Sequence, residues 1–261
     1  MYDAMLAWGF QNQVGENYMR LIILGLDALD IDMVEKLDLR ALKQVQYGEL
    51  KVPLSSVSGY PRSPSVWATF LSGEVHEIEF TRNKEGVNLF RGELSRSFID
   101  LNGVKAINVP YHNHEINTLT KLVRLRKKIR WPGTIRRIAP VHNSRTEEIF
   151  NEVINSDENH KVIFAFIQTL DTLQHILFLR PKIIQKAYEH MERSFADLKE
   201  KLSEDRIIIV SDHGFNFEKG IHSYTGFYSC NHVLKPIPTD ISEFYGITKD
   251  FLKGEKTHDN H

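Results

Sequence analysis

The chain has 261 residues, of which 41% are hydrophobic, and a formal net charge of −1 at pH 7. This size allows one substantial core, so we expect a single domain over residues 1–261, and the near-neutral balance gives no reason to expect a nucleic-acid partner. The one cysteine, Cys230, rules out an intrachain disulfide and favours a reducing, cytoplasmic compartment, while the apolar runs are too short to span a bilayer.

The composition of each end of the chain gives one expectation. Residues 1–18 include apolar side chains but lack the basic region and long apolar stretch of a secretory signal. We therefore expect no cleaved signal peptide, and Met19 is a candidate natural start. The polar tail, residues 253–261, is expected to be disordered, and its histidines are not counted as ligands.

The first predicted strand covers residues 21–26 and leads into Asp27. A continuous apolar run of this length is typical of a strand buried on both faces, and open α/β sheets bind ligands at the carboxyl ends of such strands. Asp27 is therefore expected at that edge, although a lone carboxylate there is more often a cap or turn residue. A helix over residues 31–44 and a strand over residues 45–52 follow.

Residues 63–73 are predicted to form a helix, because Pro64 suits a first turn and Gly73 suits a helix C-terminus. Ser63 is then placed at the N-cap, and by frequency alone it is a capping residue. The functional alternative is a nucleophile. The N-terminal amides that stabilise a cap also stabilise a phosphoryl oxygen, and a nearby metal would lower the pKa of the hydroxyl.

A basic run lies in the middle of the chain, after a predicted strand over residues 104–109. It places eight Lys or Arg residues among apolar ones: Lys121, Arg124, Arg126, Lys127, Lys128, Arg130, Arg136 and Arg137 around Leu122, Leu125, Ile129 and Trp131. Such a run is most often a solvated helix face. It could instead be a small cap, at about residues 112–145, whose positive potential attracts an anionic substrate, or a nucleic-acid or membrane surface. A helix over residues 145–154 follows.

A second buried strand, residues 161–169, leads to Asp171 and His175. If the segment after the strand is helical, the i, i+4 spacing puts both side chains on one face within reach of a single ion. Taken alone the pair is weak evidence, since the surrounding leucines and isoleucines could make His175 a hydrogen-bonded core residue.

A third buried strand, residues 206–210, runs directly into Ser211, Asp212 and His213, and His222 follows at a distance that a short loop can close. This mixture of carboxylate and imidazole donors suits zinc or manganese. A helix over residues 183–202 and a strand over residues 223–228 complete the pattern. The alternation of strands and helices predicts an α/β fold, a three-layer α/β/α sandwich with a mostly parallel central sheet.

Together these segments resemble the alkaline phosphatase superfamily, most closely its type I phosphodiesterase/nucleotide pyrophosphatase branch. Members of that branch have an apolar strand ending in Gly-x-Asp, a nucleophile segment resembling Thr-x-Pro-x-Trp-Thr-Ser-Phe-Leu-Thr-Gly, an Asp-x-x-x-His segment, a Ser-Asp-His-Gly segment and a final histidine. In this chain Ser63 falls on the nucleophile, Trp67 on the aromatic residue and Gly73 on the closing glycine. The Asn-Val-Pro-Tyr stretch at residues 108–111 is also similar to one in prokaryotic members.

The resemblance implies an alkaline phosphatase-like fold and two divalent metal ions, Zn or Mn. Its pattern divides the ligands between them: Asp27, Ser63, Asp212 and His213 for one ion, and Asp171, His175 and His222 for the other. The implied activity is that of a phosphohydrolase. It would cleave phosphodiester, pyrophosphate or phosphomonoester bonds in a small phosphorylated substrate, with nucleotides among the candidates, through a phospho-serine intermediate on Ser63.

Two departures from the family pattern leave alternatives open. The proline follows Ser63 directly rather than two residues on, which keeps Ser65 as a rival nucleophile, and the expected His-Gly after Gly73 is replaced by His76-Glu77. A phosphoglycerate mutase-like phosphotransferase would need a large inserted domain. A sulfatase is disfavoured because Cys230 is remote from the nucleophile segment and no arginine follows Ser63 in that family's pattern. An inactive ligand-binding member of the fold is the remaining alternative.

Overall fold

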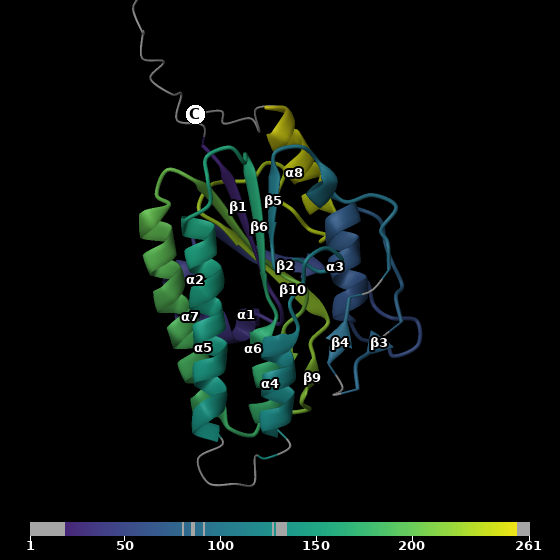
Figure 1. Ribbon diagram of the computed structural model, residues 1–261, viewed down its shortest axis with the longest axis vertical. Helices are drawn as coiled ribbons and strands as arrows, with labels where there is room; N and C mark the ends of the chain where they lie inside the picture. The colour runs from purple at the N-terminus through teal and green to yellow at the C-terminus, as the bar shows by residue number, and fades with distance from the viewer. Residues whose placement is uncertain are drawn as a thin grey trace, which may run out of the picture.

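Six strands form the central sheet of the computed structural model (Figure 1): β1 (Leu21–Leu26), β2 (Gln46–Lys51), β5 (Val104–Ile107), β6 (Val162–Ile167), β7 (Arg206–Ser211) and β10 (Thr225–Cys230). Their order across the sheet is β2-β10-β7-β1-β6-β5. Strand β1 runs parallel to β6 and β7, and β5 runs parallel to β6, whereas β10 is antiparallel to both of its neighbours. The predicted mostly parallel sheet is confirmed.

The structure describes residues 19–79, 81–84, 87–90, 92–126, 128 and 135–254. The expectations for residues 1–18, for the tail after Gly254, and for Lys127, Ile129, Arg130 and Trp131 lie outside this part of the chain. Within it, no helix has the length and apolar character needed to cross a membrane.

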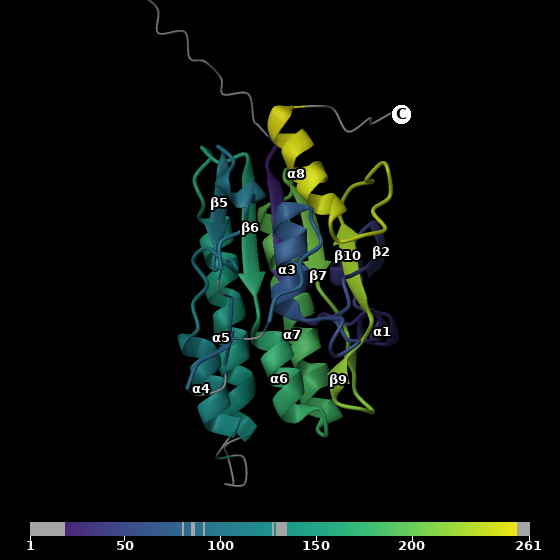
Figure 2. The ribbon, with the colours of Figure 1, turned by 90° about the vertical axis from the view of Figure 1, so that its right-hand side faces the viewer.

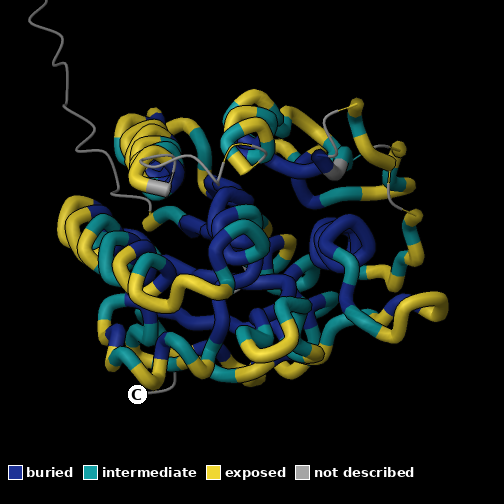
Figure 3. The backbone as a smooth tube through the Cα atoms, turned by 90° about the horizontal axis from the view of Figure 1, so that it is seen from below, coloured by how far each residue is buried: buried dark blue, intermediate teal, exposed yellow. Residues whose placement is uncertain are grey.

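Each face of the sheet buries a core of its own. Along β1, Ile22, Leu24 and Leu26 point to one face and Leu21 and Ile23 to the other, and all five are buried. Complete burial of such a side chain contributes roughly 1.5–3 kcal/mol. Helices cover both faces (Figures 1 and 2): α5 (Ile135–Ile154), α6 (Thr169–Leu177) and α7 (Pro181–Lys201) lie on the first, α3 (Ser63–Ser72) and α8 (Glu243–Lys253) on the second. The predicted three-layer sandwich is confirmed, with buried backbone at the centre in the view from below (Figure 3).

The predicted helix over residues 31–44 is wrong in one respect, because it is two helices, α1 (Ile31–Lys36) and α2 (Arg40–Lys43). The chain turns between them at Asp38, whose φ of 49° is incompatible with a continuing helix. Leu39 and Leu42 stay buried on the far side of the turn, so the apolar periodicity does not reveal the break. The helix expected from residue 145 begins earlier, at Ile135, and continues through Pro140.

The described part of the basic run belongs to two helices, α4 (Asn117–Arg126) and the start of α5. Leu119, Leu122 and Ile138 are buried, and α4 packs against α5 and α6. The basic side chains of the run that the structure describes are exposed, in agreement with a solvated face: Lys121, Arg124, Arg126, Lys128, Arg136 and Arg137.

The remaining elements are two hairpins and a 3-10 turn: β3 (Thr81–Arg82) with β4 (Asn88–Leu89), β8 (Phe215–Asn216) with β9 (Ile221–His222), and Phe98–Asp100.

Trp67 fixes helix α3 against the sheet beside Gly25. A Cβ atom on Gly25 would lie 3.0 Å from both the Trp67 and Phe164 rings, so the missing side chain leaves room for the indole to pack on β1. The indole also packs edge-to-face against Phe166, with ring centroids 4.9 Å apart. The glycine two residues before Asp27 thereby allows the start of α3 to lie next to the carboxyl end of β1.

Candidate metal centre

The register of the sheet places the strand-end acids at one edge. Strand β1 pairs with β7 so that Gly25 lies opposite Val210, and the same register continued along both strands sets Asp27 beside Asp212. The backbone N–H of Asp27 donates to the carbonyl of Ile167, at the end of β6, at 3.0 Å. The three strands named in the sequence prediction therefore end together.

Asp27, Asp212 and His213 form a first group, the Asp27 cluster. Their ligand atoms lie within 4.8 Å of one another, and all three side chains are fully buried. His213 Nε2 is 3.2 Å from Asp212 Oδ2 and 3.6 Å from Asp27 Oδ1. The Ser63 hydroxyl joins them, with Oγ 3.0 Å from His213 Nε2 and 3.4 Å from Asp27 Oδ1. The structure thus brings together all four residues predicted for one ion.

The backbone determines which nitrogen of His213 faces this cluster. His213 Nδ1 lies 3.0 Å from the carbonyl oxygen of Gly214, which can only accept, so Nδ1 carries the proton. Nε2 therefore keeps its lone pair, as a metal ligand requires. Ser211 holds the same segment in place, because its Oγ donates to the His213 carbonyl at 2.9 Å and accepts from the N–H of Leu29 at 2.8 Å.

Asp171, His175 and His222 form a second group, the Asp171 cluster, whose ligand atoms also lie within 4.8 Å of one another. Asp171 and His175 share one face of α6, as the spacing predicts, with Asp171 Oδ1 and His175 Nε2 3.2 Å apart. The β8–β9 hairpin, in which Phe215 pairs with His222, returns the second histidine to the site. His222 Nε2 is 3.4 Å from Asp171 Oδ1 and 2.9 Å from His175 Nε2.

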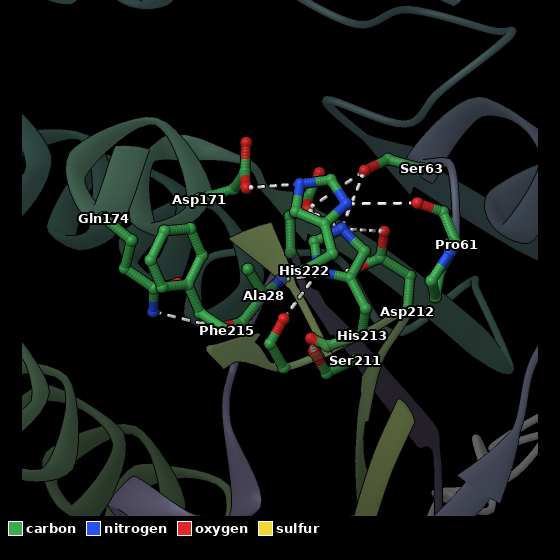
Figure 4. Close-up of polar contacts among 12 residues, drawn as sticks. Ala28, Pro61, Ser63, Asp171, Gln174, Ser211, Asp212, His213, Phe215 and His222 are labelled. Carbon is green, nitrogen blue, oxygen red and sulfur yellow. Dashed lines mark hydrogen bonds and ion pairs between the residues drawn. The ribbon is translucent and has the colours of Figure 1, made fainter. Parts of the chain in front are cut away.

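His222 also joins the two clusters. Its Nδ1 donates to the carbonyl of Pro61 at 3.1 Å, which leaves Nε2 facing Asp171. Its ring stacks on that of His213, with centroids 3.6 Å apart and planes inclined by 14°. Figure 4 shows the side chains of Asp171, His222, His213, Asp212 and Ser63 converging on one small region.

Burial and mutual repulsion act on the two carboxylates of the Asp27 cluster. Burial, reinforced by the neighbouring charge of Asp212, raises the pKa of Asp27 well above its usual value. Burial likewise raises the pKa of Asp212 to about 7. Burial lowers the pKa of His213 well below its usual range, and nearby His222 adds to the effect, so this imidazole is neutral and does not balance the acids. The cluster therefore favours an added cation.

The Asp171 cluster has the opposite balance. Burial disfavours the ionised form of Asp171, but the facing imidazoles of His175 and His222 outweigh it and hold the pKa of Asp171 well below its usual value. Burial alone would lower the pKa of His222, yet the neighbouring carboxylate of Asp171 raises it. Asp171 is thus a carboxylate with two imidazoles beside it, one carboxylate oxygen and two nitrogens aimed at a common point.

Three buried carboxylate oxygens in these clusters lack a hydrogen-bond partner: Asp27 Oδ2, Asp212 Oδ2 and Asp171 Oδ1. The last lies close to two imidazole nitrogens, but without hydrogen-bond geometry. Burying a polar group without a hydrogen bond costs about 2–7 kcal/mol, and burying an unpaired charge also costs several kcal/mol. A divalent cation at each cluster would remove that cost. The donor sets, oxygen with imidazole nitrogen and one neighbouring hydroxyl, fit zinc or manganese.

The structure distinguishes the two candidate nucleophiles by what their hydroxyls contact. Ser63 points to the Asp27 cluster, whereas Ser65 Oγ accepts from the N–H of Ile78 at 2.9 Å and lies 3.4 Å from its carbonyl. Ser65 therefore fastens the loop after α3. The predicted N-cap position of Ser63 is wrong by one residue: the helix begins at Ser63, and Arg62 is the N-cap. Pro64 then occupies the second position, where its missing N–H costs nothing.

Several supporting residues were not predicted from the sequence. Asp30 caps α1 through Met33 N–H at 3.0 Å and accepts from Phe215 N–H at 2.9 Å, which anchors the segment after His213. The Gln174 amide donates to the Ala28 carbonyl at 3.0 Å. These are ordinary polar residues in the sequence, and an N-cap aspartate before residue 31 is the signal that could have found Asp30. His76, near the missing His-Gly, contacts Ser72 Oγ at 2.9 Å and belongs to neither cluster.

Comparison with solved structures gives matches over nearly the whole chain. An alkaline phosphatase from the Antarctic bacterium TAB5 matches with a TM-score of 0.54 and 10% identity, over 92% of this chain and 98% of that chain. The PH0037 protein from Pyrococcus horikoshii matches with a TM-score of 0.53 and 10% identity, over 93% and 99% of the two chains. A 2-O GAG sulfatase matches with a TM-score of 0.51 and 10% identity, over 94% and 76%. No family model and no curated protein matches this sequence.

Proposed function

From the alkaline phosphatase fold and the two ligand clusters at its sheet edge, we propose that this chain is a two-metal phosphohydrolase with Ser63 as its nucleophile. The observation that carries the proposal is the position of the Ser63 hydroxyl. It lies 3.0 Å from His213 Nε2 and 3.4 Å from Asp27 Oδ1, at the first residue of α3. A serine held there combines a nucleophilic oxygen, metal-ligand side chains and the N-terminal amides of a helix.

The seven predicted side chains divide between two ions: Asp27, Ser63, Asp212 and His213 for one, and Asp171, His175 and His222 for the other. When bound, the ions would lower the pKa of the Ser63 hydroxyl and neutralise charge on the transferring phosphoryl group. Zinc and manganese are the ions proposed for both positions, because the donors are carboxylate oxygens and imidazole nitrogens. The single-domain organisation over residues 1–261 is part of the same proposal.

Ser63 performs the chemistry in two displacements. Its Oγ forms a bond to phosphorus as the bond to the ester oxygen breaks on the opposite side, which gives phospho-Ser63 and an alcohol. Water then attacks phosphorus from the vacated side, and the Ser63 oxygen leaves as a hydroxyl with release of phosphate or a phosphate monoester. The start of α3, with its free backbone N–H groups, faces the phosphoryl oxygens during both steps.

A sulfate ester is the second candidate substrate class, since a sulfatase shares the fold. Cys230 argues against a cysteine-derived nucleophile. It is buried in β10, where it pairs with Gln46 and Ile208, away from the carboxyl end of β7, and burial raises the pKa of its thiol to about 11. The segment inserted between β5 and β6 is largely the helices α4 and α5, which pack on the helical layer, so we do not propose the mutase alternative.

Turnover of chromogenic esters tests the proposal. The purified chain, stripped of metal and reconstituted with Zn²⁺ or Mn²⁺, is assayed with p-nitrophenyl phosphate, bis-p-nitrophenyl phosphate and p-nitrophenyl sulfate. We expect hydrolysis of at least one phosphate ester, its loss on chelation, and little activity on the sulfate. The relative rates on the first two esters decide between a preference for phosphomonoesters and a preference for phosphodiesters. Activity on the sulfate alone would overturn the proposal.

A further inference from the structure

A cavity of about 330 Å³ opens beside the Asp171 cluster. Its lining includes Asp171 and His175 of α6, Arg126 of α4 and Arg82 of the β3–β4 hairpin. The cavity lies within the size range of small-molecule sites, about 300–1,000 Å³. It is contiguous with the candidate metal centre rather than a separate depression.

The geometry of in-line displacement at phosphorus relates this cavity to the leaving group of the substrate. Ser63 lies against the Asp27 cluster, 3.0 Å from His213, and the His213 ring stacks on that of His222, which belongs to the Asp171 cluster. An in-line attack expels the leaving oxygen on the side opposite the Ser63 hydroxyl. Asp171 and His175 line the cavity, so a leaving group expelled toward the Asp171 cluster would enter it.

The walls of the cavity define the chemistry of that group. Apolar side chains cover much of the lining: Val87, Leu119, Val123, Ile176 and Phe178. The Phe178 ring meets Gly220, where a Cβ would lie 3.1 Å from it, so the loop before His222 closes tightly over this wall. A leaving group with an apolar or aromatic body would therefore be sheltered from water.

The positive charge of the lining comes from arginine. Arg126 has no carboxylate partner within the described part of the chain. Asp171 also lines the cavity, but its carboxylate faces His175 and His222. An arginine near an apolar wall offers a planar fork of N–H donors to a carboxylate or phosphate. Gln168 adds a polar group, since it is 5% exposed and its Oε1 has no hydrogen-bond partner.

We propose that this cavity selects substrates whose leaving group carries a second anionic group on an apolar body, with Arg126 as the residue that recognises the anion. The proposal rests on the phosphohydrolase function and adds the substrate class to it. Lys121 supplies a matched control, because it lies on the same helix but lines a different hollow with Arg124 and Lys128.

Two esters that differ only in charge test the assignment: the phosphate monoester of 4-hydroxybenzoic acid and that of its methyl ester. Binding is measured by calorimetry on the Zn²⁺-loaded Ser63→Ala protein, so that turnover does not intervene. We expect the carboxylate ester to bind about tenfold more tightly than the methyl ester, the scale of one charge-assisted hydrogen bond. Arg126→Met should abolish this preference, Arg126→Lys should restore part of it, and Lys121→Met should leave it unchanged.

Three results would overturn the proposal. The first two are no binding of either ester and no preference for the carboxylate ester in the Ser63→Ala protein. The third is an equal loss of that preference in Arg126→Met and Lys121→Met, which would mean that the overall positive charge of α4 causes it. Kinetics on the protein with Ser63 intact report the hydrolase function separately. Absence of turnover for both esters and for bis-p-nitrophenyl phosphate, with a preference that still depends on Arg126, would refute the hydrolase and leave the assignment of the cavity standing.

Discussion

The imidazole rings of His213 and His222 stack face to face, with centroids 3.6 Å apart. Each ring donates its Nδ1 hydrogen to a backbone carbonyl, that of Gly214 for His213 and that of Pro61 for His222. The two Nε2 atoms are therefore turned to different clusters by fixed backbone groups. Because Pro61 lies two residues before Ser63, the same contact links the position of the second histidine to the start of α3.

Metal content should follow the two clusters. We expect about two divalent ions per chain, one for each of the two ligand groups. Asp212→Ala and Asp171→Ala should each lose at least one ion, because each substitution removes a ligand and leaves a buried site incomplete. Asp157→Ala is the control: this exposed carboxylate also faces a histidine, His160, at 2.7 Å, but no third ligand joins them among the residues that the structure describes. Elemental analysis after gel filtration measures the content, and full retention in Asp212→Ala would contradict the site.

Gly214 should tolerate no side chain. A Cβ there would collide with the Asp30 carboxylate and lie 2.7 Å from Ser223 Oγ, and Asp30 holds Phe215 beside His213. We expect Gly214→Ala to lower the free energy of unfolding by about 1–3 kcal/mol and to weaken metal binding. Gly246→Ala, in helix α8 with open space around it, should instead stabilise the protein by about 0.5–1 kcal/mol. Urea titration of both variants makes the comparison, and equal effects would count against a crowded Gly214.

The sequence was sufficient for those parts of the site that local pattern determines. Asp27 and Asp212 follow apolar strands, and i, i+4 spacing alone puts Asp171 and His175 on one helix face. Two features could not be predicted from the sequence, because they depend on tertiary packing. They are the stacking of His213 on His222 at 3.6 Å and the hydrogen bond by which Ser65 holds the loop at Ile78. Neither has a local signature, since both require the positions of other elements.

The break in the predicted helix over residues 31–44 shows the same limit. Its turn at Asp38 has a positive φ, but the apolar periodicity runs through it because the residues on both sides remain in the core. The length of helix α5 was underestimated for a related reason, since it begins at Ile135 and not at residue 145. Pro140 argues against a helix locally, while the packing of Ile138 into the core stabilises one.

His142 should make stability fall in mild acid. Burial, with a smaller contribution from His190, lowers the pKa of this histidine from 6.5 to about 3, and its Nδ1 lies 2.7 Å from Thr169 Oγ1. Below pH 6.5 the unfolded chain binds a proton at this position that the folded chain does not, so stability is full above that pH and declines toward pH 3. Between pH 7 and pH 5 the loss from this group is about 2 kcal/mol.

The comparison that isolates His142 is with His142→Asn, which does not titrate. Urea titrations at pH 7 and pH 5 should show a loss of stability smaller by about 2 kcal/mol in the variant than in the parent. An identical loss in the two proteins would mean that His142 is protonated in the folded state.

Cys230 should be dispensable for chemistry. It is buried in β10, and its sulfur lies 3.7 Å from the Gln46 carbonyl rather than in the Asp27 or the Asp171 cluster. We expect Cys230→Ser to keep turnover within a few-fold of the parent, with some loss of stability from the buried polar replacement. A loss of activity by several orders of magnitude in a folded variant would mean that the nucleophile has been misassigned.

The two serines of helix α3 should behave differently when each is replaced by alanine. Ser63→Ala removes the hydroxyl next to His213 and Asp27 and should lower kcat by several orders of magnitude with metal largely retained. Ser65→Ala removes the bond to Ile78 and should lower kcat by about tenfold or less, with the main effect on stability. Metal content and thermal unfolding of both variants separate loss of chemistry from loss of the site.

Trapping the covalent intermediate tests the role of Ser63 most directly. The metal-loaded protein is mixed with the best phosphate ester, quenched in acid within the first turnover, digested, and mapped by mass spectrometry. The account predicts a phosphoryl group on Ser63, and none in the Ser63→Ala protein. A phosphoryl group on Ser65, or turnover with no phosphorylated serine at either position, would contradict it.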